Sequence, residues 1–216
     1  LTLFSVMALP MAVGMAIWEG RAEDERTLAS LTWARGAVAY AGGPYLLIAH
    51  VPWLSVLAIW FVAAQAAVFL RFSGGDHIEM GETGVNTSQG QVTWEEFDGN
   101  RWFMGSSTEE YMFQTELLLA DGGASIGINF VLACTALQSM VIFIGAIAVL
   151  DIDWRRRCRV LFLTVPLIHV LNLFRNAGLI WLHSTYVDWT LLGMSVFEFG
   201  HSYFARFVSL FAMFLM

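Results

Sequence analysis

The strongest constraint on the fold is the apolar run from Tyr45 to Phe72, in which Arg71 is the single Asp, Glu, Lys or Arg residue. A helix of this length matches the hydrocarbon thickness of a bilayer. The whole chain is 57% hydrophobic and 13% charged, whereas a soluble domain carries about 25% charged residues. We therefore expect a multi-pass protein of the cell membrane. Backbone polar groups must pair internally in lipid, which favours helices over a barrel.

The predicted fold is all-α, a bundle of about six spans or dipping helices. The expected helices are Leu1–Trp18, Thr27–Gly43 (a span or a shorter dipping helix), Tyr45–Phe72, Ile126–Leu150, Arg159–Arg175 and Thr190–Met216, with Asn176–Val187 at the interface. This predicts N-terminal helices in 1–72, one aqueous loop in 73–125 and a second helical group in 126–216. Charge follows Trp18 without a small-residue cleavage site, so no signal peptide is expected.

The aqueous loop is acidic and contains a predicted β-hairpin. Ten of the eighteen acidic residues lie between Ser73 and Asp121. Gln91–Gly105 alternates aromatic and polar residues around Asp98-Gly99, a pair that favours hairpin turns. Tyr111–Ala120 is predicted to be a short strand or a helix.

The basic residues predict the orientation of the chain. All eleven are Arg, and four of them stand together at Arg155, Arg156, Arg157 and Arg159. Short basic loops stay in the cytoplasm, so the acidic loop is expected outside. Following the helices outward from this basic loop places Cys134, Arg175, His201 and Arg206 near the outer surface. No basic stripe with interleaved aromatics occurs, so no nucleic-acid partner is expected.

Cys134 is the candidate nucleophile. A free cysteine is commonly a small buried hydrophobe, but polar residues surround this one: Thr135, Gln138 and Ser139. An Arg within reach would lower the thiol pKa below its free value of about 8.5. Cys158 is expected at the inner surface, so the two cysteines cannot form a disulfide with each other.

The other candidates are charged or polar residues at the same depth. Arg175 reads either as an Arg reaching the headgroups or as one facing the bundle, where Asn172 would contact its guanidinium. His201 and Arg206 are five residues apart, roughly 140° around a regular helix, unless Gly200 disturbs it. Glu198 would pair with Arg206. The histidines lack metal-ligand spacing, so no metal or cofactor is expected.

Three ordered motifs resemble the exosortase/archaeosortase family, and most of all its archaeosortase A branch. They are A-C-T-A-L-Q-S-M around Cys134, L-F-R-N around Arg175 and G-H-S-Y-F-A-R from Gly200 to Arg206. The resemblance covers Ile126–Met216. The first 125 residues resemble the family only in having spans and a variable outer loop. Family members of this branch are longer, so the resemblance implies that N-terminal spans are missing here.

The resemblance implies a sortase-like cysteine transpeptidase whose active site faces the outside. Its partners would be surface proteins with a C-terminal tripartite signal (a Pro-Gly-Phe-type motif, a transmembrane helix and a basic tail) and a membrane lipid acceptor. Cys134 would be the nucleophile and Arg175 the second essential residue. Arg206 would be the third, with His201 as acid or base. The supporting residues would be Thr135, Gln138, Asn172, Asn176 and Glu198.

Two other readings remain open at this stage. A transporter or channel subunit would need polar residues at mid-depth on several helices, and only His169 and Asn172 fit. A non-catalytic membrane protein of the same fold would tolerate loss of the Cys134 thiol. A rhomboid-like serine peptidase is disfavoured because no G-x-S-x-G motif occurs.

Overall fold

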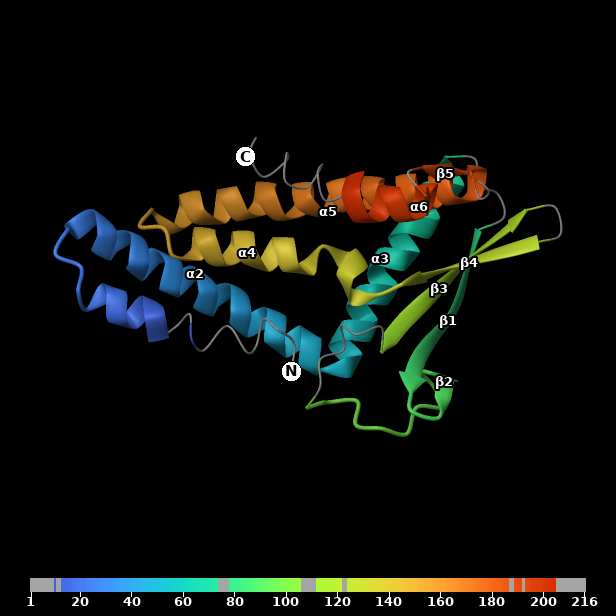
Figure 1. Cartoon of the computed structure of the whole chain (residues 1–216), viewed down its shortest axis with the longest axis horizontal. Helices are drawn as coiled ribbons and strands as arrows, with labels where there is room; N and C mark the ends of the chain where they lie inside the picture. The colour runs from blue at the N-terminus through green and yellow to red at the C-terminus, as the bar shows by residue number, and fades with distance from the viewer. Residues whose placement is uncertain are drawn as a thin grey trace.

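The computed structural model describes residues 10, 13–73, 78–105, 112–121, 124–186, 189–191 and 193–204, and most of them are helical, as expected. Within this part, two helices are long and apolar enough to cross a membrane, α3 (Pro52–Phe72) and α5 (Trp154–Thr185). Helices α2 (Glu25–His50), α4 (Leu137–Ala148) and α5 lie side by side, while α3 crosses near one end (Figure 1). The expected span Leu1–Trp18 falls mostly outside the described residues.

Helix α2 continues past the point where the sequence predicted a break. Its first turn is capped by Asp24, whose carboxylate accepts from the Thr27 backbone N–H. Pro44 lies inside the helix, and the chain breaks instead at Val51, before Pro52 starts α3. A proline removes one backbone hydrogen bond, but a helix end in apolar surroundings would leave several groups unpaired. The division at Gly42-Gly43-Pro44 is therefore wrong.

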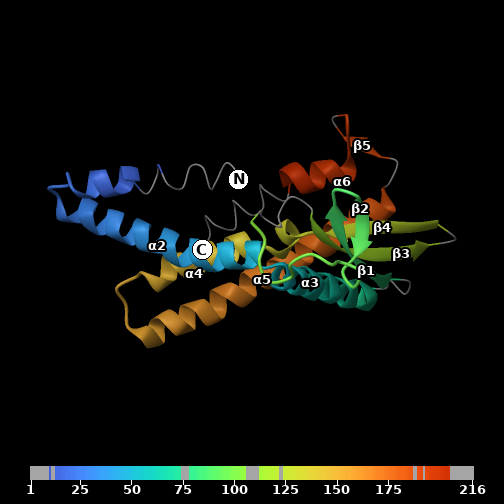
Figure 2. The same ribbon diagram turned by 90° about the horizontal axis from the view of Figure 1, so that it is seen from below.

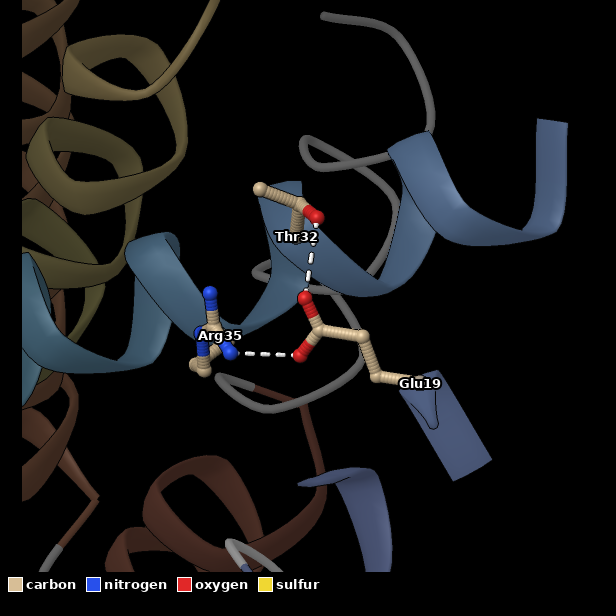
Figure 3. A network of polar contacts seen from close by, with 3 residues as sticks. All are labelled: Glu19, Thr32 and Arg35. Carbon is tan, nitrogen blue, oxygen red and sulfur yellow. Dashed lines mark hydrogen bonds and ion pairs between the residues drawn. The ribbon is translucent and has the colours of Figure 1, made fainter. Parts of the chain in front are cut away.

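An ion pair joins α2 to the helical residues 13–19 before it. The Glu19 carboxylate accepts from the Thr32 hydroxyl and from the Arg35 guanidinium (Figure 3). Arg35 is the charge that made its segment an ambiguous span, and Glu19 neutralises it. The Arg35 side chain is 56% exposed, so we expect the pair to stabilise the fold by less than about 1 kcal/mol.

A four-stranded antiparallel sheet is built mainly from residues of the predicted loop, so the protein is not purely α-helical. Its order is β2-β1-β3-β4. The strands are β1 (Ile78–Thr87), β2 (Gly90–Thr93), β3 (Phe113–Asp121) and β4 (Ala124–Phe130). Alternate residues of the sheet, such as Val85, Phe113 and Leu117, are fully buried. This face packs against α3, which Figure 2 shows lying along the sheet.

The expected hairpin around Asp98-Gly99 does not form. The hairpin turn lies at residues 88–89, between β1 and β2. The aromatic residues that predicted two strands form a cluster instead, because Trp94 and Phe97 pack on Phe113 with ring centroids 5.7 and 5.9 Å away. The Arg101 guanidinium lies over the Trp94 ring and donates to three backbone carbonyls, which fixes the loop without strand pairing.

The predicted span Ile126–Leu150 is three different elements. Its first residues belong to β4, which also crosses the predicted boundary at residue 125. The 3-10 helix η1 (Leu132–Thr135) follows, and then α4. Helix α4 has 12 residues, about 18 Å at 1.5 Å per residue, and is too short for a hydrocarbon core of about 30 Å. It packs closely on α2, because a Cβ at Gly145 would lie 2.4 Å from the Ala37 carbonyl oxygen.

Helix α5 is longer than expected. It runs through Arg175, the predicted end, and includes most of the predicted interfacial segment. Its 32 residues give a length of about 48 Å, so both ends extend beyond a hydrocarbon core of about 30 Å. The basic residues that were expected in a loop form its first turns.

After α5 the chain makes a short hairpin of β5 (Thr190–Leu191) and β6 (Met194–Ser195). It then forms α6 (Val196–Phe199) and the π-helical turn η2 (Gly200–Phe204). The helix is therefore disturbed at Gly200, as expected. Residues 205–216, the rest of the predicted last span, lie outside the described residues.

Candidate active site

Cys134 lies on a tight turn between a strand and a helix. Within η1 its backbone N–H donates to the Val131 carbonyl at 2.8 Å. Ala136 follows with a φ of +54°, the one non-glycine residue with positive φ in the described part of the chain. Such a conformation costs on the order of 1 kcal/mol or more and persists when the surroundings impose it. The thiol is thus presented by a strained turn and not by a regular helix.

Thr135 stabilises this turn. Its hydroxyl donates to the Leu132 carbonyl at 2.7 Å and accepts from the Leu137 backbone N–H at 3.2 Å. The side chain is 2% exposed. The hydroxyl therefore links the end of η1 to the first residue of α4, and Thr135 supports the position of Cys134 without facing solvent.

Two asparagines of α5 bind the backbone of Cys134. The Asn172 and Asn176 side-chain amides donate to the Cys134 carbonyl oxygen at 2.8 and 2.9 Å. Residues four apart share one face of a helix, and both asparagines are 5% exposed. Because a carbonyl oxygen has two lone pairs, the two asparagine amides together saturate the Cys134 carbonyl oxygen. These hydrogen bonds hold the cysteine turn against α5 at the level of Asn172 and Asn176 along the helix.

Arg175 lies beside this pair. Its Nη1 donates to the Asn172 Oδ1 at 3.3 Å, so Asn172 contacts both the guanidinium and the cysteine backbone. Arg175 is half-buried and its Nε is shielded from solvent. The structure therefore brings Cys134 and Arg175 into one polar cluster through Asn172.

Burial raises the pKa of the Cys134 thiol. A hydrogen bond from the Val131 backbone and the positive charge of Arg175 act in the opposite direction, but each has a smaller effect. The expectation that a nearby Arg lowers this pKa below that of a free thiol is therefore wrong for the resting protein. Desolvation disfavours the thiolate more than one partly buried cation favours it. Burial therefore favours the protonated form of the Cys134 thiol over the thiolate.

We expect alkylation of Cys134 to need alkaline pH. In a Cys158→Ala variant, the rate of reaction with iodoacetamide should reach half of its maximum above pH 8.5, the approximate pKa of a free thiol. Removing the Arg175 charge should move the midpoint higher still. The adduct is measured by mass spectrometry across the pH series. A midpoint at or below that of a free thiol would contradict burial as the dominant effect.

The remaining predicted residues have other contacts. The Gln138 amide donates to the Tyr45 hydroxyl of α2 at 3.0 Å. Glu198 closes a capping box with Ser195 at the start of α6. His201 lies in η2, where its ring stacks on Phe197 with centroids 5.9 Å apart. Arg206 lies outside the described residues, so its expected pairing with Glu198 stays a prediction.

An apolar cavity of about 380 Å³ lies between α3, α5 and the cysteine turn. It is lined by Ala58, Phe61, Val62, Thr135, Leu137, Met140, Val165, Pro166 and His169. At its wall the His169 ring hydrogen-bonds to the Gln65 side chain, a polar pair between the two apolar helices. Sequence reasoning did not predict Gln65 as the partner of His169. The cavity suits a hydrocarbon group better than a charged one.

The comparisons with known proteins concern this same half of the chain. Residues 114–216 match the transmembrane exosortase family (Exosortase_EpsH). This part of the chain is therefore similar to the transmembrane exosortases. The chain is also similar to archaeosortase A of Haloferax volcanii, which is 37% identical over 91 residues. That alignment covers 42% of this chain and 25% of the relative. No solved structure matches. The family and the apolar helices together place the protein in a membrane.

Proposed function

We propose that this protein is a membrane cysteine transpeptidase of the exosortase/archaeosortase type. It would cleave the C-terminal sorting signal of surface proteins and transfer the new C-terminus to a membrane lipid. The observation that supports this most directly is the clamp on Cys134. Two asparagines of α5 hold its backbone, and Arg175 of the same helix lies next to them. Enzymes of unrelated folds also carry the nucleophile on a strained strand-to-helix turn.

The proposed reaction starts when the Cys134 proton is removed, with His201 as the proposed base. The thiolate attacks the carbonyl carbon at the signal motif, and Arg175 with a first-turn backbone N–H of α4 stabilises the oxyanion. The C–N bond then breaks, and the leaving amine takes the proton from His201. A lipid headgroup nucleophile attacks the thioester and releases the thiol. Arg206 is the proposed third essential residue, a second cation for the thiolate.

Helix α5 supports an active site at the outer face. Its first turns carry the Arg cluster that the positive-inside rule keeps in the cytoplasm. Arg157 and Arg175 are 18 residues apart (175 minus 157), about 27 Å along a helix. That is close to the hydrocarbon thickness of about 30 Å. Arg175 and Cys134 would then lie at the opposite, outer interface.

The substrate would arrive from within the bilayer. A sorting signal that contains its own transmembrane helix reaches an interfacial site by lateral diffusion, without leaving the lipid. The apolar cavity beside Thr135 is lined by residues of the two apolar helices α3 and α5, so it suits a hydrocarbon group of such a substrate or of the acceptor lipid. We propose that it accommodates this group during transfer.

The test uses a reporter fused to a Pro-Gly-Phe motif, a transmembrane helix and a basic tail. Membranes that contain the protein should shorten the reporter by the mass of the helix and tail and add the mass of a lipid. A matched reporter with Ala-Ala-Ala in place of the motif should remain intact. Intact-mass analysis reads both results. Equal processing of both reporters, or of neither, would refute the proposed function.

The asparagine clamp should matter for turnover more than for binding. Leucine has a shape similar to that of asparagine but donates no hydrogen bond. In each single variant, Asn172→Leu or Asn176→Leu, the Cys134 carbonyl therefore loses one donor, and the double variant leaves this carbonyl unsatisfied. We expect each single change to lower kcat about tenfold and the double change about 100-fold, because small misplacements of a nucleophile are costly. KM for the reporter should change less than threefold. A rise in KM with an unchanged kcat would contradict the positioning role.

A further inference from the structure

The strand that leads to Cys134 has a free edge. Among the described residues β4 pairs with β3 alone, because the sheet order places it last. Natural sheets protect such edges with charged residues, proline or short length. Strand β4 reads A-S-I-G-I-N-F, is seven residues long and has no charged residue or proline. The strand at the opposite edge, β2, is only four residues long.

The extended backbone of β4 continues almost to the thiol. Val131 retains an extended conformation, with φ −123° and ψ 170°, before η1 begins. The backbone from Asn129 to Cys134 spans at most about 17 Å. In Figure 1, β4 runs from the far end of the sheet back to the turn from which α4 starts. A peptide lying along this edge would therefore continue past the nucleophile.

The register shows which backbone groups face outward. The Asn86 N–H donates to the Met112 carbonyl, so Met112 and its alternate neighbours on β3 bond towards β1. The residues between them, including Thr115, bond towards β4, where Thr115 pairs with Phe130. Hydrogen-bonded and non-bonded pairs alternate in an antiparallel ladder. The N–H and C=O groups of Gly127 and Asn129 consequently point to the free edge.

We propose that this edge binds the substrate as an added strand. The occupant is the extended segment of the sorted protein directly before its signal motif. This inference rests on the proposed function, because that function requires an extended peptide at Cys134. Main-chain hydrogen bonds to Gly127 and Asn129 would supply affinity independent of side chains. Gly127 is exposed and has no side chain that would obstruct the approaching backbone.

Disulfide cross-linking tests the geometry without turnover. The protein carries Cys134→Ser, Cys158→Ala and Asn129→Cys, and the reporter carries one cysteine at successive positions before its motif. Added-strand binding predicts cross-links at every second reporter position, because side chains alternate between faces. The matched control has Gln91→Cys on β2, the opposite edge, and should give none. Uniform cross-linking, or equal cross-linking from both edges, would overturn the proposal.

Kinetics provide the second test. Asn129→Pro removes an outward N–H while β4 keeps its bonds to β3, so KM for the reporter should rise about fivefold to tenfold, as expected for one lost hydrogen bond. Gln91→Pro removes the equivalent N–H on β2 and should leave KM unchanged. An unchanged KM in Asn129→Pro together with absent cross-links would refute strand addition but would leave the proposed function standing. Alternating cross-links in the Cys134→Ser protein, together with no processing of the reporter by the protein that keeps Cys134, would retain strand addition and refute the proposed chemistry.

Discussion

Replacing Cys134 with Ser should lower processing of the reporter by at least about 1,000-fold. Serine has nearly the same volume and preserves the bonds that Asn172 and Asn176 make to the backbone of this residue. The turn, the cavity and the contact with α5 should therefore remain. What disappears is the sulfur nucleophile, and a hydroxyl without a strong base is far less reactive. The change in rate is measured as the initial rate of reporter shortening in membranes.

Cys158 provides the internal control for this experiment. It is exposed near the start of α5, far along the helix from Asn172. Cys158→Ser should process the reporter at the wild-type rate. Both variants should accumulate in membranes to the wild-type level, which quantitative immunoblotting measures. Retained processing in Cys134→Ser would show that the nucleophile has been assigned to the wrong residue.

Replacing Arg175 with Ala should lower kcat by about 100-fold to 1,000-fold, the usual effect of removing one oxyanion donor from an active site. The guanidinium lies against Asn172, which also holds Cys134, so its loss affects both charge and position. Arg175→Lys should recover only part of the activity. A lysine keeps the charge, but its single ammonium cannot reproduce the planar set of donors.

The matched control for Arg175 is another arginine on the same helix. Arg156 is exposed in the first turn of α5, and Arg156→Ala removes one positive charge far from the cysteine turn. It should leave kcat and KM within about twofold of wild type. An Arg175→Ala protein with normal kcat would exclude the proposed electrostatic role, whatever its effect on KM.

The helical and membrane character of the chain could be predicted because apolar runs report directly on burial in lipid. Their boundaries could not. Pro44 and Arg175 are typical of helix ends, yet both lie inside helices. At Pro44, a helix end in apolar surroundings would leave backbone groups unpaired. Strand β4 was missed for another reason. Ile126, Ile128 and Phe130 alternate with Gly127 and Asn129, which is the period of a strand, but the alternation is short and runs directly into a longer apolar stretch that resembles a helix.

The candidate site shows the same limit at the level of single residues. Asn172, Arg175 and Asn176 could be selected because polar residues in an apolar helix need partners. The turn at Ala136 could not, since alanine does not favour a positive φ. The raised pKa of Cys134 was also missed, because the degree of burial depends on how α3 and α5 pack around the turn and not on the neighbouring sequence.

The most direct measurement is the mass of the covalent intermediate. The purified protein in lipid nanodiscs is mixed with the reporter, quenched in acid and digested. The Cys134 peptide should then carry the N-terminal reporter fragment as a thioester that neutral hydroxylamine releases. Cys134→Ala should show no adduct. An adduct on any other residue, or reporter turnover without an adduct in the presence of excess substrate, would contradict Cys134 as the nucleophile.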